Sequence, residues 1–372
     1  MTTFASAGHE SQFSQPGMAL DFAENHPMLT RRAVLALVAL CFSVPLAGQA
    51  DRTDEFIKAQ MTQQRIPGLA LAIVKNGQVV KAAGYGYANI ASKIPATAET
   101  VFKIASVSKP VLASGVLVLV QDGRLGLDDP VSKHLEGTPA SWSGITIRHL
   151  LSHTSGLVRE GPAFGPSKVQ PDADVIRSAY GEPLRFAPGE RYEYGNLNYF
   201  ILAEIIRRVS GRPWTEFLDT RVFKPAGMLT TYPTNTKATI ANRALGYADN
   251  DNHRPAPEWK ALRPSGAFLS TVLDLAKWDA ALDTDRVLTA ETRRAMWNPA
   301  KLRDGRDAPY GLGWFVSSSK GRTRVQHTGG MPGARAGFVK YLEDHLTIIV
   351  LMNLDDVDID SIVTGLAALH LS

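Results

Sequence analysis

Short apolar runs separated by turn residues, near both ends of the chain, predict the strands of an antiparallel sheet. Residues 68–89 read as two strands joined by a tight turn at Asn76 and Gly77. Four more short strands are predicted toward the C-terminus, within residues 310–319, 323–330, 334–343 and 346–354. A helical segment from Asp51 precedes the first strand, and residues 358–372 are predicted to close the chain as a helix.

Between these two ends, the apolar residues recur with helical spacing. This spacing appears in segments 111–121, 198–209 and 271–283. Loops rich in proline and glycine interrupt it at 161–172 and 253–266. We therefore predict an α+β fold: an antiparallel sheet built from both chain ends and flanked by helices, with a mostly helical inserted region over about residues 110–300. A cleft is expected where the inserted region meets the sheet.

The first fifty residues have the pattern of an export signal rather than of a folded element. A pair of arginines precedes an apolar run, and the small residues Gly48 and Ala50 suit cleavage before Asp51. We exclude residues 1–50 from the fold and predict that Met28 is the true start, because a long polar stretch ahead of such a signal is unusual. A periplasmic or secreted location is expected, by the secretory or the twin-arginine route.

Composition and charge exclude several kinds of chemistry. The 372 residues, 44% of them hydrophobic, are enough for a large core. The 40 basic and 36 acidic residues are scattered, without the long basic run expected of a nucleic-acid-binding protein. Cys41, the only cysteine, lies inside the signal, so the mature chain has no thiol nucleophile and no disulfide. The apolar run of the signal is too short to predict stable membrane insertion after its removal.

The segment "ASVSKP", residues 105–110, carries the first candidate chemistry. Ser106 and Lys109 are three residues apart at the predicted start of a helix, so they face the same side. Pro110 suits one of the first helical positions. A lysine pressed against the apolar run that follows is partly desolvated, and this lowers its pKa. Its amine could then take a proton from the serine. The free N–H groups at the helix start could stabilise an oxyanion.

An isolated S-x-x-K is usually only a helix cap beside a solvated lysine. A second copy at Ser317 to Lys320 lies in a polar turn between predicted strands, and we discount it. Two further elements support the first copy. Tyr194 and Asn196 lie in "YGN", and the third element lies at the end of a predicted strand as His327, Thr328 and Gly329.

In this order, the three elements resemble the S-x-x-K, Y-x-N and K/H-T-G motifs of the serine β-lactamase and penicillin-binding-protein superfamily. The segments "DGRLGLDDPVSKHL", "ITIRHLLSHTSGL" and "YGLGWFV" look like one branch of it. That branch contains class C β-lactamases, D-alanyl-D-alanine carboxypeptidases, D-aminopeptidases and β-lactamase-fold esterases. The resemblance runs from about Asp54 to the C-terminus, so residues 51–372 are expected to form one β-lactamase-like serine hydrolase domain.

The resemblance implies a role for each matching residue. Ser106 would be the nucleophile that forms an acyl-enzyme, and Lys109 would help to deprotonate it. Tyr194 would pass the proton to the leaving group and later assist the attacking water. Asn196 would hold the substrate's amide or the lysine. The field of Lys109 and His327 is expected to lower the pKa of the Tyr194 phenol.

The edge strand is expected to border the cleft. His327 and Thr328 would face it, with Gly329 beside them among the substrate-binding positions. The backbone N–H of Gly330 would join that of Ser106 as an oxyanion hole. A histidine stands where true β-lactamases typically carry a lysine. Because imidazole is mostly neutral near pH 7, this shifts the expectation toward peptidases or esterases. Arg335, just past this element, is either a second carboxylate-binding residue or a solvated strand residue.

His149 and His153 are four residues apart, a spacing that can bind zinc on one helical face. No glutamate completes an H-E-x-x-H motif, so a metal site is not predicted. The sequence also holds no G-x-S-x-G nucleophile elbow.

These observations favour an exported serine hydrolase that cleaves an amide or ester bond through a Ser106 acyl-enzyme, without a metal or cofactor. The substrate would be a small molecule or peptide: a β-lactam, a D-amino-acid peptide or a short ester. Selectivity is expected to lie in the loops 158–175 and 232–264. The alternative is a covalent sensor or binding protein that is acylated without turnover. Nothing in the sequence indicates the oligomeric state.

Overall fold

The computed structural model describes residues 47–248, 251–259, 263–319 and 321–371. These residues belong to one compact unit. Nearly all of the predicted export signal lies outside the described residues; the first helix, α1 (Ala47–Gln64), begins just before the predicted cleavage position. Among the described residues, no helix is both long and apolar enough to cross a membrane.

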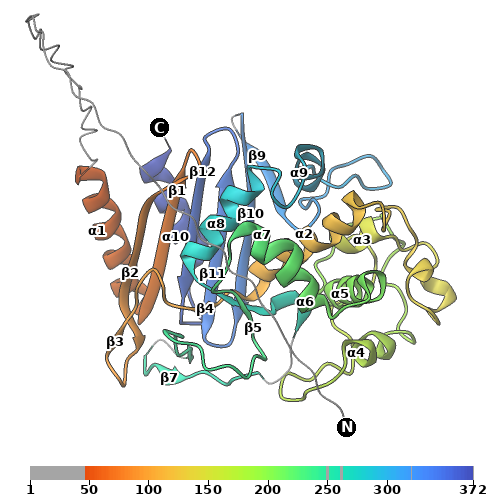
Figure 1. Ribbon diagram of the computed structural model, residues 1–372, viewed down its shortest axis with the longest axis horizontal. Coiled ribbons are helices and arrows are strands. Elements are labelled where there is room, and N and C mark those ends of the chain that lie inside the picture. The colour runs from red at the N-terminus through yellow and green to blue at the C-terminus, as the bar shows by residue number, and fades with distance from the viewer. Residues whose placement is uncertain (1–46, 249–250, 260–262, 320, 372) are drawn as a thin grey trace, which may run out of the picture. The chain divides into compact units, whose positions relative to one another are not determined.

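A seven-stranded antiparallel sheet, built from both ends of the chain, forms the centre of the fold (Figure 1). Its strand order is β3-β2-β1-β12-β11-β10-β9, so the first and last long strands, β1 and β12, pair at its middle. The strands are β1 (Gly68–Lys75), β2 (Gln78–Asn89), β3 (Ile94–Pro95), β9 (Phe315–Ser319), β10 (Arg322–Met331), β11 (Ala334–Tyr341) and β12 (Leu346–Met352). The α+β prediction is confirmed.

One predicted strand is shorter than expected. The pattern from Tyr310 onward predicts a strand, but β9 begins only at Phe315. The backbone N–H of Gly311 donates to the carbonyl of Trp314, and Gly313 has a φ of 96°, which an L side chain rarely adopts. This glycine-rich turn therefore precedes the strand.

Helices α1 and α10 (Ile359–His370) pack together and cover one face of the sheet. Their apolar side chains, including Ile57 and Ile362, form a cluster with Leu71, Ile348 and Val350 from the middle strands. β1 and β12 are buried along almost their whole length because helices lie on both faces. This explains their continuous apolar runs.

The opposite face carries the inserted helical region, which extends to the right in Figure 1. Its α-helices are α2 (Ser108–Gln121), α3 (Ile147–Leu151), α4 (Asp172–Ser178), α5 (Leu197–Ser210), α6 (Trp214–Leu218), α7 (Lys224–Ala226), α8 (Val272–Leu282) and α9 (Ala290–Trp297). Helix α8 packs on β1 and β12, whereas α2 packs on α5. The first twelve residues of α2 are all buried, so this helix is the centre of the larger core.

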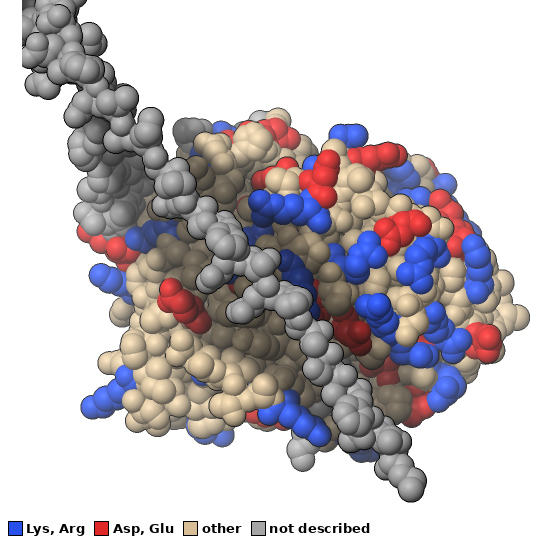
Figure 2. Space-filling model, in the orientation of Figure 1, with Lys and Arg blue, Asp and Glu red and all other residues tan. Residues whose placement is uncertain are grey.

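Two small sheets within the inserted region carry no strong sequence signal. β8 (Phe268–Ser270) pairs with β4 (Phe102–Lys103) and β5 (Tyr232–Pro233), and β6 (Tyr247–Ala248) pairs with β7 (Arg254–Pro255). The pairing of β4 with β8 matters for function, because it brings the segment before β8 beside the start of α2. On the face shown in Figure 2, basic and acidic side chains are interspersed over the helical part.

Candidate active site

Ser106 lies in a single 3₁₀ turn, Ala105–Val107, immediately before α2. Two contacts with the β8 segment fix this turn: the N–H of Ile104 donates to the carbonyl of Phe268, and the N–H of Phe268 donates to the Ser108 hydroxyl. Ala105 has a φ of 43°, an unfavourable value for a residue with a Cβ. The packing of two sheets and α2 therefore holds a strained backbone next to the serine.

Lys109 is fully buried one turn into α2. Its Nζ lies 3.0 Å from Ser106 Oγ, 2.9 Å from Asn196 Oδ1 and 2.9 Å from the carbonyl oxygen of Ser265. Burial holds the pKa of Lys109 well below its ordinary value, and the nearby Arg263 lowers it further. Lys109 therefore loses its ammonium proton more readily than an ordinary lysine does.

A neutral amine has two N–H groups and one lone pair. The Asn196 and Ser265 oxygens can only accept hydrogen bonds, so they take both N–H groups of Lys109. The third contact of Lys109 Nζ is Ser106 Oγ, at 3.0 Å, and once the amine is neutral its lone pair can accept the proton of this hydroxyl. This is the arrangement that a general base needs before the serine attacks.

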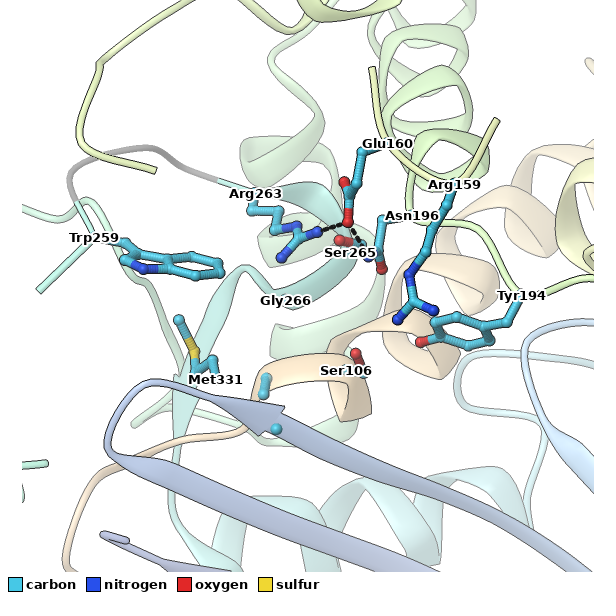
Figure 3. A pocket seen from close by; sticks show the side chains of 12 residues that line it. Ser106, Arg159, Glu160, Tyr194, Asn196, Trp259, Arg263, Ser265, Gly266 and Met331 are labelled. Carbon is cyan, nitrogen blue, oxygen red and sulfur yellow. Dashed lines mark hydrogen bonds and ion pairs between the residues drawn. The ribbon is translucent and has the colours of Figure 1, made fainter. Parts of the chain in front are cut away.

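Glu160 fixes the orientation of the Asn196 amide. Asn196 Nδ2 donates to Glu160 Oε1, so Asn196 Oδ1 faces Lys109. The same carboxylate oxygen forms an ion pair with Arg263. In Figure 3 the three side chains lie together along one wall of the pocket. The negative charge of Glu160 also acts to raise the pKa of Lys109, against the effect of Arg263.

The structure brings Tyr194 and Ser106 to the lining of the same pocket. The Tyr194 ring centroid lies 4.6 Å from Lys109 Nζ. Burial raises the pKa of Tyr194 above its ordinary value, whereas the nearby Ser106 hydroxyl and the charges of Arg263 and Arg159 act to lower it. The expectation of a phenol pKa lowered by Lys109 and His327 is therefore wrong, because desolvation dominates and the neighbouring cations are arginines.

His153 supports Tyr194 from behind. Its Nδ1 accepts hydrogen bonds from the Gly195 backbone at 3.2 Å and from Asn198 Nδ2 at 3.0 Å. Its ring centroid lies 4.3 Å from that of Tyr194. His149, by contrast, accepts a hydrogen bond from the Thr146 backbone and caps α3. The two histidines thus have separate structural partners.

His327 lies under the site instead of in it. It is buried, its Nε2 lies 2.9 Å from the Tyr310 hydroxyl, and its Nδ1 lies 2.6 Å from the Thr328 carbonyl. Burial lowers the pKa of His327 to about 3, so the ring is neutral. We expected His327 to border the cleft and to contribute a positive field, and neither expectation is met. The neutral ring forms a hydrogen bond with Tyr310, and it packs against the Tyr194 ring without lining the pocket.

The second half of β10 approaches the serine through its glycines. A Cβ on Gly329 would lie 2.5 Å from the Ile104 carbonyl and 2.9 Å from the Ser106 nitrogen, so only glycine allows this approach. Gly330 lines the pocket, whereas Thr328, which is half-buried, does not. The pairing of β10 with β9 ends at Gln326. After Gln326, no strand of the described residues pairs with this edge of β10, which faces the pocket.

The pocket holds about 190 Å³ and is mostly polar (Figure 3). It is lined by Ala105, Ser106, Arg159, Glu160, Tyr194, Asn196, Trp259, Arg263, Ser265, Gly266, Gly330 and Met331. Four of these lining residues were not identified from the sequence: Arg159, Glu160, Trp259 and Arg263. All four fall in the two loops, 158–175 and 232–264, that were expected to determine selectivity. Their residue types carry no motif of their own.

Comparisons with known proteins find relatives of this chain. The chain is 32% identical over 312 residues to penicillin-binding protein 4* of Bacillus subtilis, covering 78% of this chain and 68% of that protein. It is 29% identical to protein flp of Staphylococcus aureus, covering 82% of this chain and 63% of that protein, which is somewhat less than two thirds of its length.

Solved structures share the fold. The octameric penicillin-binding protein homologue of Pyrococcus abyssi matches with a TM-score of 0.74 at 28% identity, over 86% of this chain and 77% of that one. The D-amino acid amidase of Ochrobactrum anthropi matches with a TM-score of 0.72 at 24% identity, over 85% of this chain and 99% of that one. The family model named Beta-lactamase matches residues 53–370. The chain therefore belongs to the Beta-lactamase family.

Proposed function

We propose that the protein is a serine hydrolase that cleaves an amide or ester bond through an acyl-enzyme on Ser106. The observation that carries this proposal is the environment of Lys109: a fully buried amine, 3.0 Å from Ser106 Oγ, with both of its N–H groups taken by acceptors. Burial lowers the pKa of such an amine, and it faces the hydroxyl that it must deprotonate.

In the acylation step, the Ser106 oxygen attacks the substrate carbonyl as its proton moves to Lys109. The backbone N–H groups of Ser106 and Gly330 stabilise the negative oxygen of the tetrahedral intermediate. The close approach of β10 to the 3₁₀ turn supports this role, since Gly329 packs directly against the Ser106 nitrogen.

Tyr194 acts as the acid. Its raised pKa keeps the phenol protonated at rest, and its place beside Ser106 in the pocket lining brings the proton near the breaking bond. Tyr194 gives this proton to the leaving group and recovers it from the Lys109 ammonium. Lys109 and Tyr194 thus have pKa values moved in opposite directions, a pattern typical of an assigned base and acid. Water then attacks the acyl carbonyl while Lys109 and Tyr194 take its proton. The bond from the acyl carbon to Ser106 Oγ breaks, and the same two residues return a proton to that oxygen.

His327 is assigned a supporting role in this proposal. Its hydrogen bond to Tyr310 packs the aromatic rings behind Tyr194, so it positions the phenol without touching substrate. Asn196 orients Lys109, and Gly330 contacts the reacting carbonyl. Export to the periplasm or the medium, with Met28 as the start, remains part of the proposal on the strength of the sequence pattern.

The test is a parallel screen of the mature protein with nitrocefin, p-nitrophenyl butyrate and a D-alanyl-D-alanine peptide. We expect turnover of at least one substrate. Ser106→Ala should abolish that turnover, whereas Ser317→Ala, in the second S-x-x-K, should leave it unchanged. Equal activity of the wild type and Ser106→Ala toward all three substrates would refute the proposal.

A further inference from the structure

Tyr194, the proposed acid, lies in a segment that belongs to no helix or strand. Residues 191–195 run without regular structure into α5, so neither a strand ladder nor a helical hydrogen bond fixes their backbone. Figure 3 shows the phenol oxygen of Tyr194 turned toward Ser106. Proton transfer requires an accurate position, because a displacement of about 1 Å can cost about 100-fold in rate. Contacts from outside the segment must therefore hold the tyrosine.

His153 holds the backbone on both sides of Tyr194. Its carbonyl oxygen accepts a hydrogen bond from the N–H of Glu193 at 2.9 Å, and its Nδ1 accepts one from the N–H of Gly195 at 3.2 Å. Its ring also packs against the phenol ring, with the two centroids 4.3 Å apart. The residue before the tyrosine, the tyrosine itself and the residue after it thus all contact one histidine.

The hydrogen bonds determine which nitrogen of the His153 ring carries the proton. The Gly195 N–H and the Asn198 amide group, at 3.0 Å, are both donors, so Nδ1 accepts and the proton lies on Nε2. The Asn198 amide is oriented in turn, because its Oδ1 accepts from the Ser155 hydroxyl at 2.7 Å. Burial holds the pKa of His153 well below its ordinary value, and the charge of Lys109 lowers it further, so the ring is neutral.

His153 occupies this position at a local cost. Its φ of 56° is left-handed, a conformation that residues with a Cβ adopt only infrequently. Its Nε2 is buried and has no hydrogen-bond partner among the described residues. Backbone strain and an unsatisfied buried N–H both oppose folding, and such features concentrate at functional sites. A histidine that served stability alone would not be expected to combine the two.

We propose that His153, as the neutral tautomer protonated on Nε2, is a positioning residue that holds the Tyr194 phenol where it protonates the leaving group. His153 does not touch the substrate, because it is fully buried and does not line the pocket. Segment 145–157, which the family resemblance singled out without a role, thereby acquires one. This inference deepens the proposed function and rests on it. Loss of His153 should matter most where the leaving group needs a proton.

The test compares two esters that form the same acyl-enzyme. From p-nitrophenyl butyrate, p-nitrophenolate departs without a proton, whereas ethoxide departs from ethyl butyrate only when an acid protonates it. The ethyl-to-nitrophenyl ratio of kcat/KM is measured for the wild type, His153→Ala, His153→Asn and His149→Asn. Asparagine tolerates a left-handed φ and offers an oxygen near the position of Nδ1, so it is the conservative variant. His149, in the same segment, caps α3 and is the matched control.

In His153→Ala, we expect this ratio to fall by about 100-fold, the cost of a misplaced acid. His153→Asn should recover part of the loss, because the Gly195 N–H regains an acceptor, and His149→Asn should keep the wild-type ratio. In Tyr194→Phe, which has no acid to position, the added His153→Ala change should not lower the ratio further. A merely structural role would give an equal loss for both esters, or the same fall in the Tyr194→Phe background, and either result would overturn the proposal.

Nuclear magnetic resonance separates this inference from the proposed function, because it needs no turnover. With ¹⁵N-labelled histidine, the His153 signals, assigned by their loss in His153→Asn, should show a protonated Nε2 and an unprotonated Nδ1 at neutral pH. With ¹³C-labelled tyrosine, the phenol signal assigned by its loss in Tyr194→Phe should shift in His153→Asn but not in His149→Asn.

The two kinds of measurement fail separately. If the wild type hydrolyses neither ester while both resonance results hold, the hydrolase proposal fails and the positioning of Tyr194 by His153 stands. A proton on Nδ1 of His153, or a Tyr194 signal that does not respond to His153→Asn, would overturn the inference even in an active hydrolase.

Discussion

At the scale of single residues, the site depends on how much water the fold removes from Lys109 and Tyr194. Both are almost fully desolvated, and burial disfavours the charged form of each: the ammonium of the lysine and the phenolate of the tyrosine. The same physical effect therefore makes one residue a base and the other an acid. The charges of Arg159 and Arg263 add to this effect on the lysine and oppose it on the tyrosine.

The pH dependence of activity should follow the lowered pKa of Lys109. Because its pKa is lowered, kcat/KM should rise with pH through a midpoint well below the 10.5 of an ordinary lysine, and fall as the amine is protonated at lower pH. Lys109→Arg keeps a cation that is never deprotonated, so activity should drop by roughly a thousandfold at every pH. A pH–rate profile of both proteins tests this. An acid limb centred near 10.5, or an active Lys109→Arg enzyme, would contradict it.

Ser106, Lys109, Tyr194 and Asn196 could be predicted from the sequence because each sits at a fixed offset in a short motif. Arg159, Glu160 and Arg263 could not, since their roles arise from contacts between two loops that are distant in sequence. The burial and the neutral ring of His327 could not be predicted for a similar reason. Its burial depends on Tyr310 and the aromatic rings around it, and no local pattern reports that packing.

At the scale of secondary-structure elements, the site exists where three segments meet: the 3₁₀ turn before α2, the end of β10 and the segment before β8. The long strands and α2, α5, α8 and α10 could be predicted because their apolar periods extend over many residues. Strands of two or three residues, such as β4 and β8, show no period and form only through tertiary contacts. These short strands nevertheless position the serine.

Gly329 tests the contact between β10 and the 3₁₀ turn. Gly329→Ala places a Cβ against the Ile104 carbonyl and the Ser106 nitrogen, so the strand must move away and the proposed oxyanion hole opens. We expect kcat to fall by roughly 100-fold or more, the effect of losing an oxyanion donor. Gly181→Ala, where no atom lies within 4 Å of the added Cβ, is the matched control. Equal kcat for the two variants would show that the close approach is not needed for activity.

At the scale of the whole molecule, a buried ion cluster joins the sheet to the inserted region. Lys340 of β11 donates to Asp279 of α8 and to Asp283 just after it, each at 2.9 Å. Thr347 of β12 also donates to Asp279. The two aspartates raise the pKa of Lys340 despite its burial, so it remains charged. The cluster fixes α8 on the face of the sheet that supports the site.

Removing one partner of this cluster should destabilise the protein strongly. Lys340→Met leaves the buried Asp279 carboxylate without its cation, and we expect the free energy of unfolding in urea to fall by about 3 to 5 kcal/mol. The control Lys301→Met breaks an exposed pair with Asp307 and should cost about 1 kcal/mol or less. Similar costs for the two variants would mean that the cluster contributes little to holding the two parts together.

The central claim is that Ser106 carries a transient acyl group, and time-resolved intact-protein mass spectrometry tests it most directly. After mixing with an activated ester, the wild type should gain the mass of one acyl group, assigned to Ser106 by peptide mapping, and then lose it as product accumulates. Ser106→Ala should gain no such mass, whereas Ser317→Ala should behave as the wild type. An adduct on another residue, or one on Ser106 that persists without product, would contradict the account, and the second result would instead identify a covalent sensor.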